Sequence, residues 1–131
     1  MVYGIGIDSV ELNRIESIYD KRQTILVNQI LTPSEREIFY TIKEKKRKIE
    51  WLAGRFSAKE AMSKAIGTGI GATFSFQDGE ILFDKSKKPI FYISDQTKKH
   101  LPFDIRIHVS ITHTNTAATA MVILEKSNEI K

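Results

Sequence analysis

The order of its hydrophobic patterns is the feature that most constrains the fold of this chain. In the first half, residues 11–30 and 49–66 carry apolar side chains at helical spacing. In the second half, runs of β-branched and aromatic residues alternate with turn residues, which is typical of strands. Helices gathered early and strands gathered late predict an α+β fold with a largely antiparallel sheet. A length of 131 residues, without an internal repeat or a linker, predicts a single domain over residues 1–131.

Two helix boundaries follow from local signals. TPSERE at 32–37 has the form of a helix start, in which Thr32 caps and Glu35 completes a capping box. The strongest helical pattern, over 49–66, is expected to end in the glycine-rich run GTGIG at 67–71.

The expected strands begin with residues 2–10. On this strand Gly4 and Gly6 share a face with Asp8, so the backbone there can be approached closely. The later strands are expected over 73–84 (divided at Asp78-Gly79), 87–94, 104–112 and 118–126.

The composition excludes several classes of protein. The chain has no cysteine, which excludes disulfides and thiolate metal sites. No run approaches the roughly 20 apolar residues of a membrane-spanning helix. The first residues lack the basic region of a signal peptide, so we expect a cytoplasmic protein with no membrane partner. The net charge of +4 attracts nucleic acid, phosphorylated metabolites, anionic lipid or acidic protein, and does not choose among them.

Asp8 stands within an otherwise apolar strand, where an unpaired buried carboxylate is costly. Two interpretations are open. In the first, Asp8 lies at the strand end and accepts backbone N–H bonds or caps the helix that starts near Glu11. In the second, Asp8 is a ligand of a hard cation, which binds oxygen and often takes one or two carboxylates beside substrate phosphates.

The segment RFSAKEAMSKAIGTGIG at 55–71 poses the same choice. Glu60 and Lys64 stand four residues apart, and an exposed pair at this spacing contributes only about 0.2–0.5 kcal/mol. Alternatively, Glu60 supplies a second metal oxygen, while Arg55 and Lys64 reach for phosphates from the same helix. The glycines would let backbone N–H groups approach a ligand closely, although the Gly-Lys-Ser/Thr ending of a P-loop is absent.

The segment HVSITHT at 108–114 forms a half-polar strand that ends near His113 and Thr114. A histidine in this place is either simply exposed or donates to a phosphate, with a charge that depends on pH near neutrality. A pairing of Ser110 with a histidine for nucleophilic catalysis lacks a nucleophile elbow and an orienting acid.

Taken together, these segments carry a family resemblance. GIGIDSVELNRI at 4–15, LAGRFSAKEAMSKAIGTG at 52–69 and HVSITHT at 108–114 resemble the three signature blocks of the holo-acyl-carrier-protein synthases. These are the small, bacterial-type 4′-phosphopantetheinyl transferases. QILTPSE at 29–35 also has a counterpart in the family, and the Phe-x-x-Lys-Glu-Ala core is the most specific part of a resemblance that covers nearly the whole chain.

The resemblance implies an α+β fold with an antiparallel sheet packed on a long central helix, and a homotrimer with active sites at subunit interfaces. It implies an enzyme that transfers 4′-phosphopantetheine from coenzyme A to a serine of apo-acyl carrier protein. The reaction would depend on Mg²⁺, for which Mn²⁺ could substitute. It would yield holo-acyl carrier protein and adenosine 3′,5′-bisphosphate and support fatty acid biosynthesis.

The resemblance also implies roles for individual residues. Asp8 and Glu60 would be the catalytic metal ligands. Arg55, His113 and Thr114 would contact the 3′-phosphate of coenzyme A and Lys64 its diphosphate. The residues expected to bind coenzyme A are therefore Arg55, Lys64, Gly67, Gly69, His113 and Thr114.

Carrier-protein docking is implied for Arg14, Lys21 and Arg22, because the carrier is acidic and these cations lie on or after the first helix. For the general base that deprotonates the carrier serine, two hypotheses are open: a Mg²⁺-bound water activated by Glu60, or Glu35.

Two other classes compete with this interpretation. The basic run KEKKRK at 43–48 would suit a nucleic-acid-binding domain, but no helix-turn-helix spacing or aromatic RNP-like motif accompanies it. We therefore expect no nucleic acid partner. The other alternative is a scaffold that only binds coenzyme A, against which the intact carboxylates argue.

Overall fold

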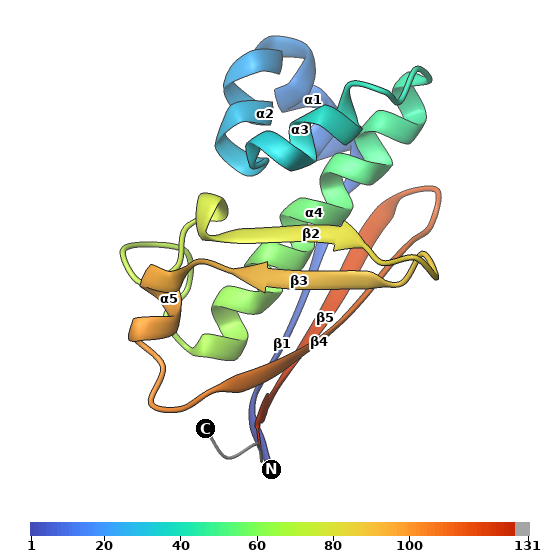
Figure 1. Cartoon of the computed structure of the whole chain (residues 1–131). Coiled ribbons are helices and arrows are strands. Elements are labelled where there is room, and N and C mark those ends of the chain that lie inside the picture. The colour runs from blue at the N-terminus through green and yellow to red at the C-terminus, as the bar shows by residue number, and fades with distance from the viewer. Residues whose placement is uncertain (128–131) are drawn as a thin grey trace.

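The computed structural model of the protein describes residues 1–127. Three short helices follow the first strand, a long helix crosses the middle of the molecule, and strands dominate the remainder (Figure 1). In chain order the elements are β1 (Val2–Glu11), α1 (Leu12–Lys21), α2 (Gln23–Ile30), α3 (Pro33–Phe39), α4 (Lys45–Ile66), the 3₁₀ helix η1 (Phe76–Asp78), β2 (Gly79–Phe83), β3 (Pro89–Ile93), α5 (Asp95–Lys99), β4 (Ile105–His113) and β5 (Ala117–Lys126).

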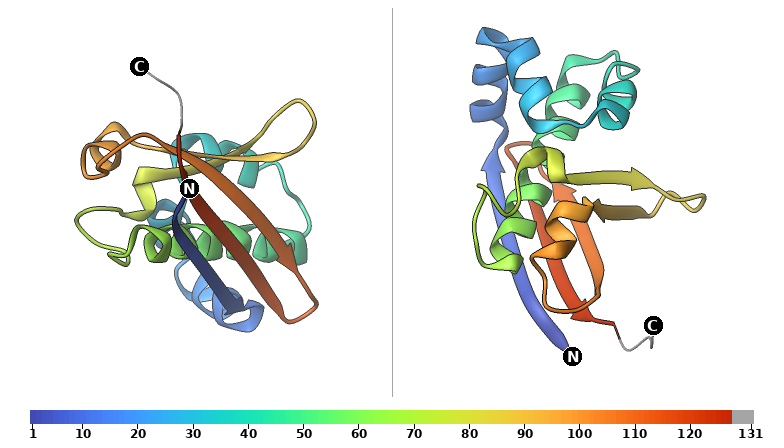
Figure 2. Two further views of the ribbon diagram at one scale, coloured as in Figure 1. Left: turned by 90° about the horizontal axis from the view of Figure 1, so that it is seen from below. Right: turned by 60° about the vertical axis from the view of Figure 1, so that its left-hand side comes forward.

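The strands form two antiparallel sheets. One has the order β1-β5-β4 and the other is the hairpin β2-β3. The three-stranded sheet packs on one side of α4, and α1, α2 and α3 gather around the N-terminal end of that helix (Figure 1). The opposite face of the three-stranded sheet has no helix over it within residues 1–127 (Figure 2). The predicted α+β class with antiparallel pairing is confirmed.

The helix α4 lies unusually close to β1. A Cβ atom added at Gly4 would overlap the carbonyl oxygen of Ala65, and one at Gly6 would overlap that of Ala61. Glycine is therefore required at both positions by contact with the helix backbone. The next residue on this face of the strand is Asp8, so the close approach brings its carboxylate to the surface of α4.

A fully buried ion pair joins the helical layer to the second sheet. Lys59 on α4 donates to Glu35 Oε1 at 2.6 Å, and both side chains are 0% exposed. The same ammonium donates to the carbonyl oxygens of Ile30 and Phe76. Glu35 Oε2 in turn accepts the backbone N–H of Ile81 at 2.8 Å. The Lys59 ammonium thus interacts favourably with the C-terminus of α2, and the ion pair with Glu35 connects α3 and β2 to α4.

The capping box predicted at the start of α3 is confirmed, because Glu35 and Thr32 bond to each other's backbone N–H groups. Both carboxylate oxygens of Glu35 are engaged by the capping box and the contacts described above, and the side chain is completely buried. The hypothesis that Glu35 is the general base is therefore wrong, since a carrier serine cannot reach it.

Several expected boundaries differ from the structure. The helical pattern over 11–30 is broken at Arg22, where the backbone leaves the helical region and two helices form. The first part of 73–84 forms η1 and a turn instead of a strand, because Asp78 accepts two hydrogen bonds from Ser75 and closes a local cap. The long helix begins at Lys45, within the basic run. The helix α5 was not expected.

None of the helices within residues 1–127 is long and apolar enough to cross a membrane.

Candidate active site

Asp8 lies inside β1 and pairs across the sheet with Ala120. The N-cap of α1 is Glu11, so Asp8 does not cap that helix and the first interpretation of its role is wrong. Its Oδ1 atom accepts a hydrogen bond from Lys64 Nζ at 3.1 Å. Its Oδ2 atom is buried and has no hydrogen-bond partner within residues 1–127. Half of this carboxylate is thus available to a ligand.

Glu60 lies beside Asp8 on the face of α4 that meets β1. Burial raises the pKa of Glu60 above its ordinary value, and the neighbouring Asp8 carboxylate raises it further. Lys64 and Arg14 act in the opposite direction and lower this pKa. Two carboxylates held together in a partly buried place disfavour their own ionisation unless a cation is shared between them.

This donor set fits a hard divalent cation of the kind the sequence implied. The unpartnered Oδ2 of Asp8 is an oxygen donor without any competing hydrogen bond in the described part of the chain. No group of three or more His, Cys, Asp or Glu suited to a metal occurs among the described residues. Two carboxylates are what Mg²⁺ takes from a protein when substrate phosphates and water supply the remaining oxygens.

Arg55 lies elsewhere on α4. Its guanidinium is stacked over the ring of Trp51, with 4.0 Å from Cζ to the ring centroid, and lies 5.2 Å from that of Phe83. The residue is 4% exposed, and burial lowers its pKa to about 10. Its Nε and Nη2 atoms have no hydrogen-bond partner in the range that the structure describes. Buried N–H groups of a guanidinium without acceptors are costly, and a phosphate that reached them would remove that cost.

Arg55 and Lys64, which the resemblance assigns to different phosphates of coenzyme A, do not reach toward the same place. They are nine positions apart on one helix, so their side chains leave it in opposite directions. Lys64 faces β1, whereas Arg55 faces Phe83 at the end of β2.

His113 and Thr114 lie at the end of β4 and are exposed. The imidazole Nδ1 of His113 lies 3.5 Å from Glu50 Oε2 on α4. Because β5 separates β4 from β1, the backbone at His113 is about 10 Å or more from that at Asp8. The structure therefore brings Asp8, Glu60 and Lys64 together and keeps His113 and Thr114 apart from them within one chain.

The glycines after α4 adopt the backbone conformation that favours this residue. Gly67 has φ of 95° and Gly69 has φ of 70°, and no atom lies within 4 Å of a Cβ added at either position. The predicted end of the helix is confirmed. The loop is open to a ligand on its outer side.

The expected docking cations Arg14, Lys21 and Arg22 are all exposed on α1 and at the junction with α2. Among them lie two apolar side chains, Ile18 and Ile25, which are 37% and 62% exposed. Lys45 at the start of α4 pairs with Asp20 at 2.8 Å, which neutralises an acidic side chain of α1. The surface that remains is cationic with exposed apolar residues.

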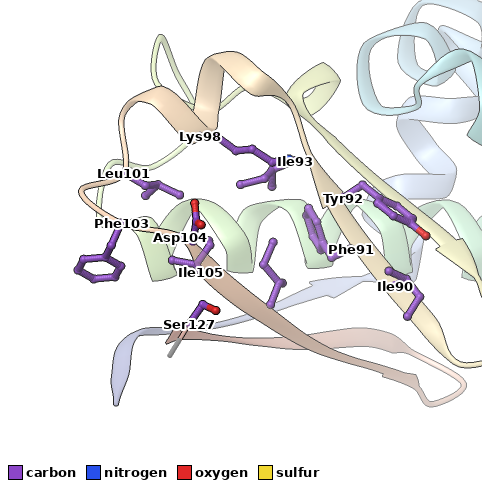
Figure 3. Close-up of a pocket in the computed structure, with 11 residues that line it drawn as sticks. Ile90, Phe91, Tyr92, Ile93, Lys98, Leu101, Phe103, Asp104, Ile105 and Ser127 are labelled. Atoms are coloured by element: carbon purple, nitrogen blue, oxygen red, sulfur yellow. The ribbon is translucent and has the colours of Figure 1, made fainter. Parts of the chain in front are cut away.

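A cavity of about 560 Å³ lies between β3, the loop after α5 and the start of β4 (Figure 3). Phe91, Leu101 and Ile105 contribute apolar walls. None of the predicted site residues lines this cavity. The carboxylate pair, rather than the hollow, therefore identifies the chemical centre.

Three contributions to the site were missed from the sequence. Trp51 precedes Arg55 by one helical turn, a spacing that could have indicated the stacking. No sequence signal places Phe83 over Arg55 or Glu50 beside His113, because both contacts join segments far apart in the chain.

Comparison with known proteins decides the family. Residues 4–122 match the model of the 4′-phosphopantetheinyl transferase superfamily. The chain belongs to this superfamily. It is 49% identical over 126 residues to a holo-acyl-carrier-protein synthase of Bacillus pumilus, which covers 96% of this chain and 98% of the relative. The resemblance predicted from the sequence is confirmed, and with it the assignment as an enzyme of the holo-acyl-carrier-protein synthase family.

Solved structures agree with this family assignment. A holo-acyl-carrier-protein synthase from Bacillus anthracis in complex with coenzyme A (3′,5′-ADP) superimposes with a TM-score of 0.84 at 45% identity, covering 97% of this chain and 99% of that one. The enzyme from Helicobacter pylori in complex with coenzyme A superimposes with a TM-score of 0.80 at 33% identity, covering 92% and 99%.

Proposed function

We propose that this enzyme transfers 4′-phosphopantetheine from coenzyme A to a serine of apo-acyl carrier protein and releases adenosine 3′,5′-bisphosphate. The observation that carries the proposal is the pair Asp8 and Glu60, with one carboxylate oxygen left free, in a chain similar to synthases with coenzyme A bound. The direct test is mass spectrometry of apo-acyl carrier protein incubated with the protein, coenzyme A and Mg²⁺. A carrier heavier by one phosphopantetheine is expected, and none should form when a chelator replaces Mg²⁺.

In the proposed reaction the serine Oγ bonds to the phosphorus that carries pantetheine, and the bond from that phosphorus to the bridging oxygen breaks. Adenosine 3′,5′-bisphosphate leaves with the bond's electron pair. Glu60 takes the serine proton, directly or through one water.

Asp8 and Glu60 would hold Mg²⁺. When bound, this ion supplies positive charge to a diphosphate that gains negative charge in the transition state. Lys64 is half-exposed and lies close enough to contribute its ammonium to the same diphosphate. The open glycine loop would lie against the nucleotide.

The predicted site has two parts that lie apart within one chain, Asp8 with Glu60 and His113 with Thr114. This separation favours a site formed between subunits. The sheet face without a helix carries exposed apolar side chains, with Ile5 61% and Ile7 56% exposed and Tyr3 and Met121 beside them. We assign this face to the contact between copies in a homotrimer. Asp8 and Glu60 of one subunit would then meet Arg55, His113 and Thr114 of a neighbour, so that neither half acts alone.

Mixed oligomers test this assembly. Glu60→Gln and Arg55→Ala subunits, unfolded and refolded together in equal amounts, should recover activity at low coenzyme A because some boundaries combine the two intact residues. Random mixing predicts about a quarter of the wild-type activity. Each variant refolded alone is the control. A mixture no more active than the average of the two variants would place both residues in one subunit's site.

Arg55→Ala should weaken the binding of coenzyme A by roughly ten- to a hundredfold, because a charge-assisted hydrogen bond to the 3′-phosphate is lost. Binding of 3′-dephospho-coenzyme A should change much less. Calorimetry with both ligands measures the difference, and a thermal melt checks that loss of stacking on Trp51 has not unfolded the protein. Equal losses for the two ligands would move Arg55 away from that phosphate.

Arg14→Glu should raise the KM for the carrier protein, because it replaces attraction to an acidic helix with repulsion. Added salt should narrow the gap to wild type, since exposed charges are screened within about 8–10 Å at physiological ionic strength. Coenzyme A binding without carrier is the control. A parallel fall in coenzyme A binding would assign Arg14, whose charge already reaches Glu60, to the nucleotide site instead.

We further propose that the protein acts in the cytoplasm and supplies holo-acyl carrier protein to fatty acid biosynthesis. The conversion of a serine hydroxyl into a thiol-bearing arm is what a carrier requires before it can hold acyl groups as thioesters.

A further inference from the structure

The ammonium of Lys64 lies against Asp8, one of the two proposed metal ligands, and neutralises part of its charge. Its Nζ atom donates to Asp8 Oδ1 at 3.1 Å and to the carbonyl oxygen of Ile7 at 3.0 Å. Both acceptors belong to β1, so the lysine side chain lies across the gap between α4 and the strand. This geometry differs from the surface pair with Glu60 that the sequence spacing suggested.

The lysine meets only part of the demand for positive charge. Asp8 and Glu60 together present two carboxylates, and Lys64 supplies one cation to one oxygen of Asp8. The other oxygen, Oδ2, stays buried without a partner in the described range. The charge of Arg14 also acts on Glu60, but neither cation bonds to Oδ2 of Asp8. A compact dication between the carboxylates would satisfy that oxygen.

We propose that Lys64 is a resident counter-ion of Asp8 that leaves the carboxylate when a divalent cation binds there, and so becomes free to contact the substrate diphosphate. The inference rests on the metal site of the proposed function. An ammonium 3.1 Å from a metal ligand is repelled by an arriving dication. The lysine side chain is 52% exposed, so it loses little packing when it departs. Metal binding and phosphate recognition would thereby be linked through one flexible side chain.

Removing the competing charge should tighten metal binding. Lys64→Met, measured by calorimetry with Mn²⁺ and no coenzyme A, is expected to bind the ion about two- to fivefold more tightly than wild type, the range set by a partly exposed charge pair. Lys46→Met is the matched control, because it makes the same change in charge at an exposed position of the same helix. It should bind Mn²⁺ as wild type does. In the same Lys64→Met variant, coenzyme A should bind more weakly than in wild type, whereas Mn²⁺ binds more tightly.

A second measurement follows the lysine itself. In wild-type protein, Mn²⁺ should raise the rate at which acetic anhydride labels Lys64, measured by mass spectrometry against Lys46 in the same sample. Unchanged or weaker Mn²⁺ binding in Lys64→Met would overturn the exchange and make Lys64 an orienting partner of Asp8. The exchange is also overturned if that variant binds no measurable Mn²⁺ at millimolar concentration.

The outcome is separable from the fate of the proposed function. If Asp8→Asn abolishes Mn²⁺ binding while Lys64→Met leaves it unchanged, the metal site stands and the exchange fails. If Asp8→Asn binds Mn²⁺ as wild type does, the metal site itself is wrong and the exchange falls with it.

Discussion

Replacing Glu60 by Gln should lower the rate of phosphopantetheine transfer by about a hundredfold or more, the range expected for loss of a general base. The substitution keeps the shape of the side chain and removes its charge, so both metal binding and proton acceptance are lost together. The measurement is the initial rate of holo-carrier formation at saturating coenzyme A and carrier, followed by mass spectrometry.

Thermal unfolding is the control for this variant, and the melting temperature should stay at or above that of wild type. Burial and Asp8 already disfavour the charged form of Glu60, so a neutral amide costs the fold little. Asp8→Asn should behave similarly, and excess Mn²⁺ should restore part of the activity of either variant. Near-normal turnover of Glu60→Gln at modest Mg²⁺ would remove Glu60 from both roles.

Lys59→Met should lower the free energy of unfolding by about 3–5 kcal/mol, because it leaves the buried carboxylate of Glu35 without its cation. The loss is large because this ammonium also serves two carbonyl oxygens, those of Ile30 and Phe76. Chemical denaturation measures the change.

Lys46→Met serves as the comparison, since Lys46 is exposed on the same helix and its loss should be close to neutral. Glu35→Gln should recover part of the stability lost by Lys59→Met when the two are combined, because the uncompensated charge is then absent. A small effect of Lys59→Met alone would mean that the buried pair of Lys59 and Glu35 adds little net stability to the fold.

Much of the fold could be predicted from the sequence because its signals are local. The capping box at Thr32, the glycine that ends α4 and the alternation along β4 each act within a few residues. The features that could not be predicted depend instead on contacts between residues far apart in the sequence. Lys59 is a charged residue in a helical pattern, and only its distant partner Glu35 explains why it is buried.

The residues of the candidate site differ in the same way, because some have local sequence signals and others depend on distant contacts. The sequence left the roles of Asp8 and Glu60 open, and the family resemblance proposed them as metal ligands; the contact between α4 and β1 places the two carboxylates near each other. The stacking of Arg55 on Trp51 could have been predicted from their spacing on the helix. The second ring beside Arg55 could not, because Phe83 belongs to a hairpin that lies later in the chain.

The pairing of the first strand with the last has a consequence for biosynthesis. Ser9, next to Asp8, bonds to Thr119 across a sequence separation of 110 residues. While the ribosome is still making the chain, β1 has no β5 to pair with, so only its contact with α4 can hold Asp8 in place. Contacts of such long range also form slowly. A chain that stops before β5 would therefore leave the strand of Asp8 without the partner it has in the described structure, and we expect such a chain to consume neither coenzyme A nor carrier protein.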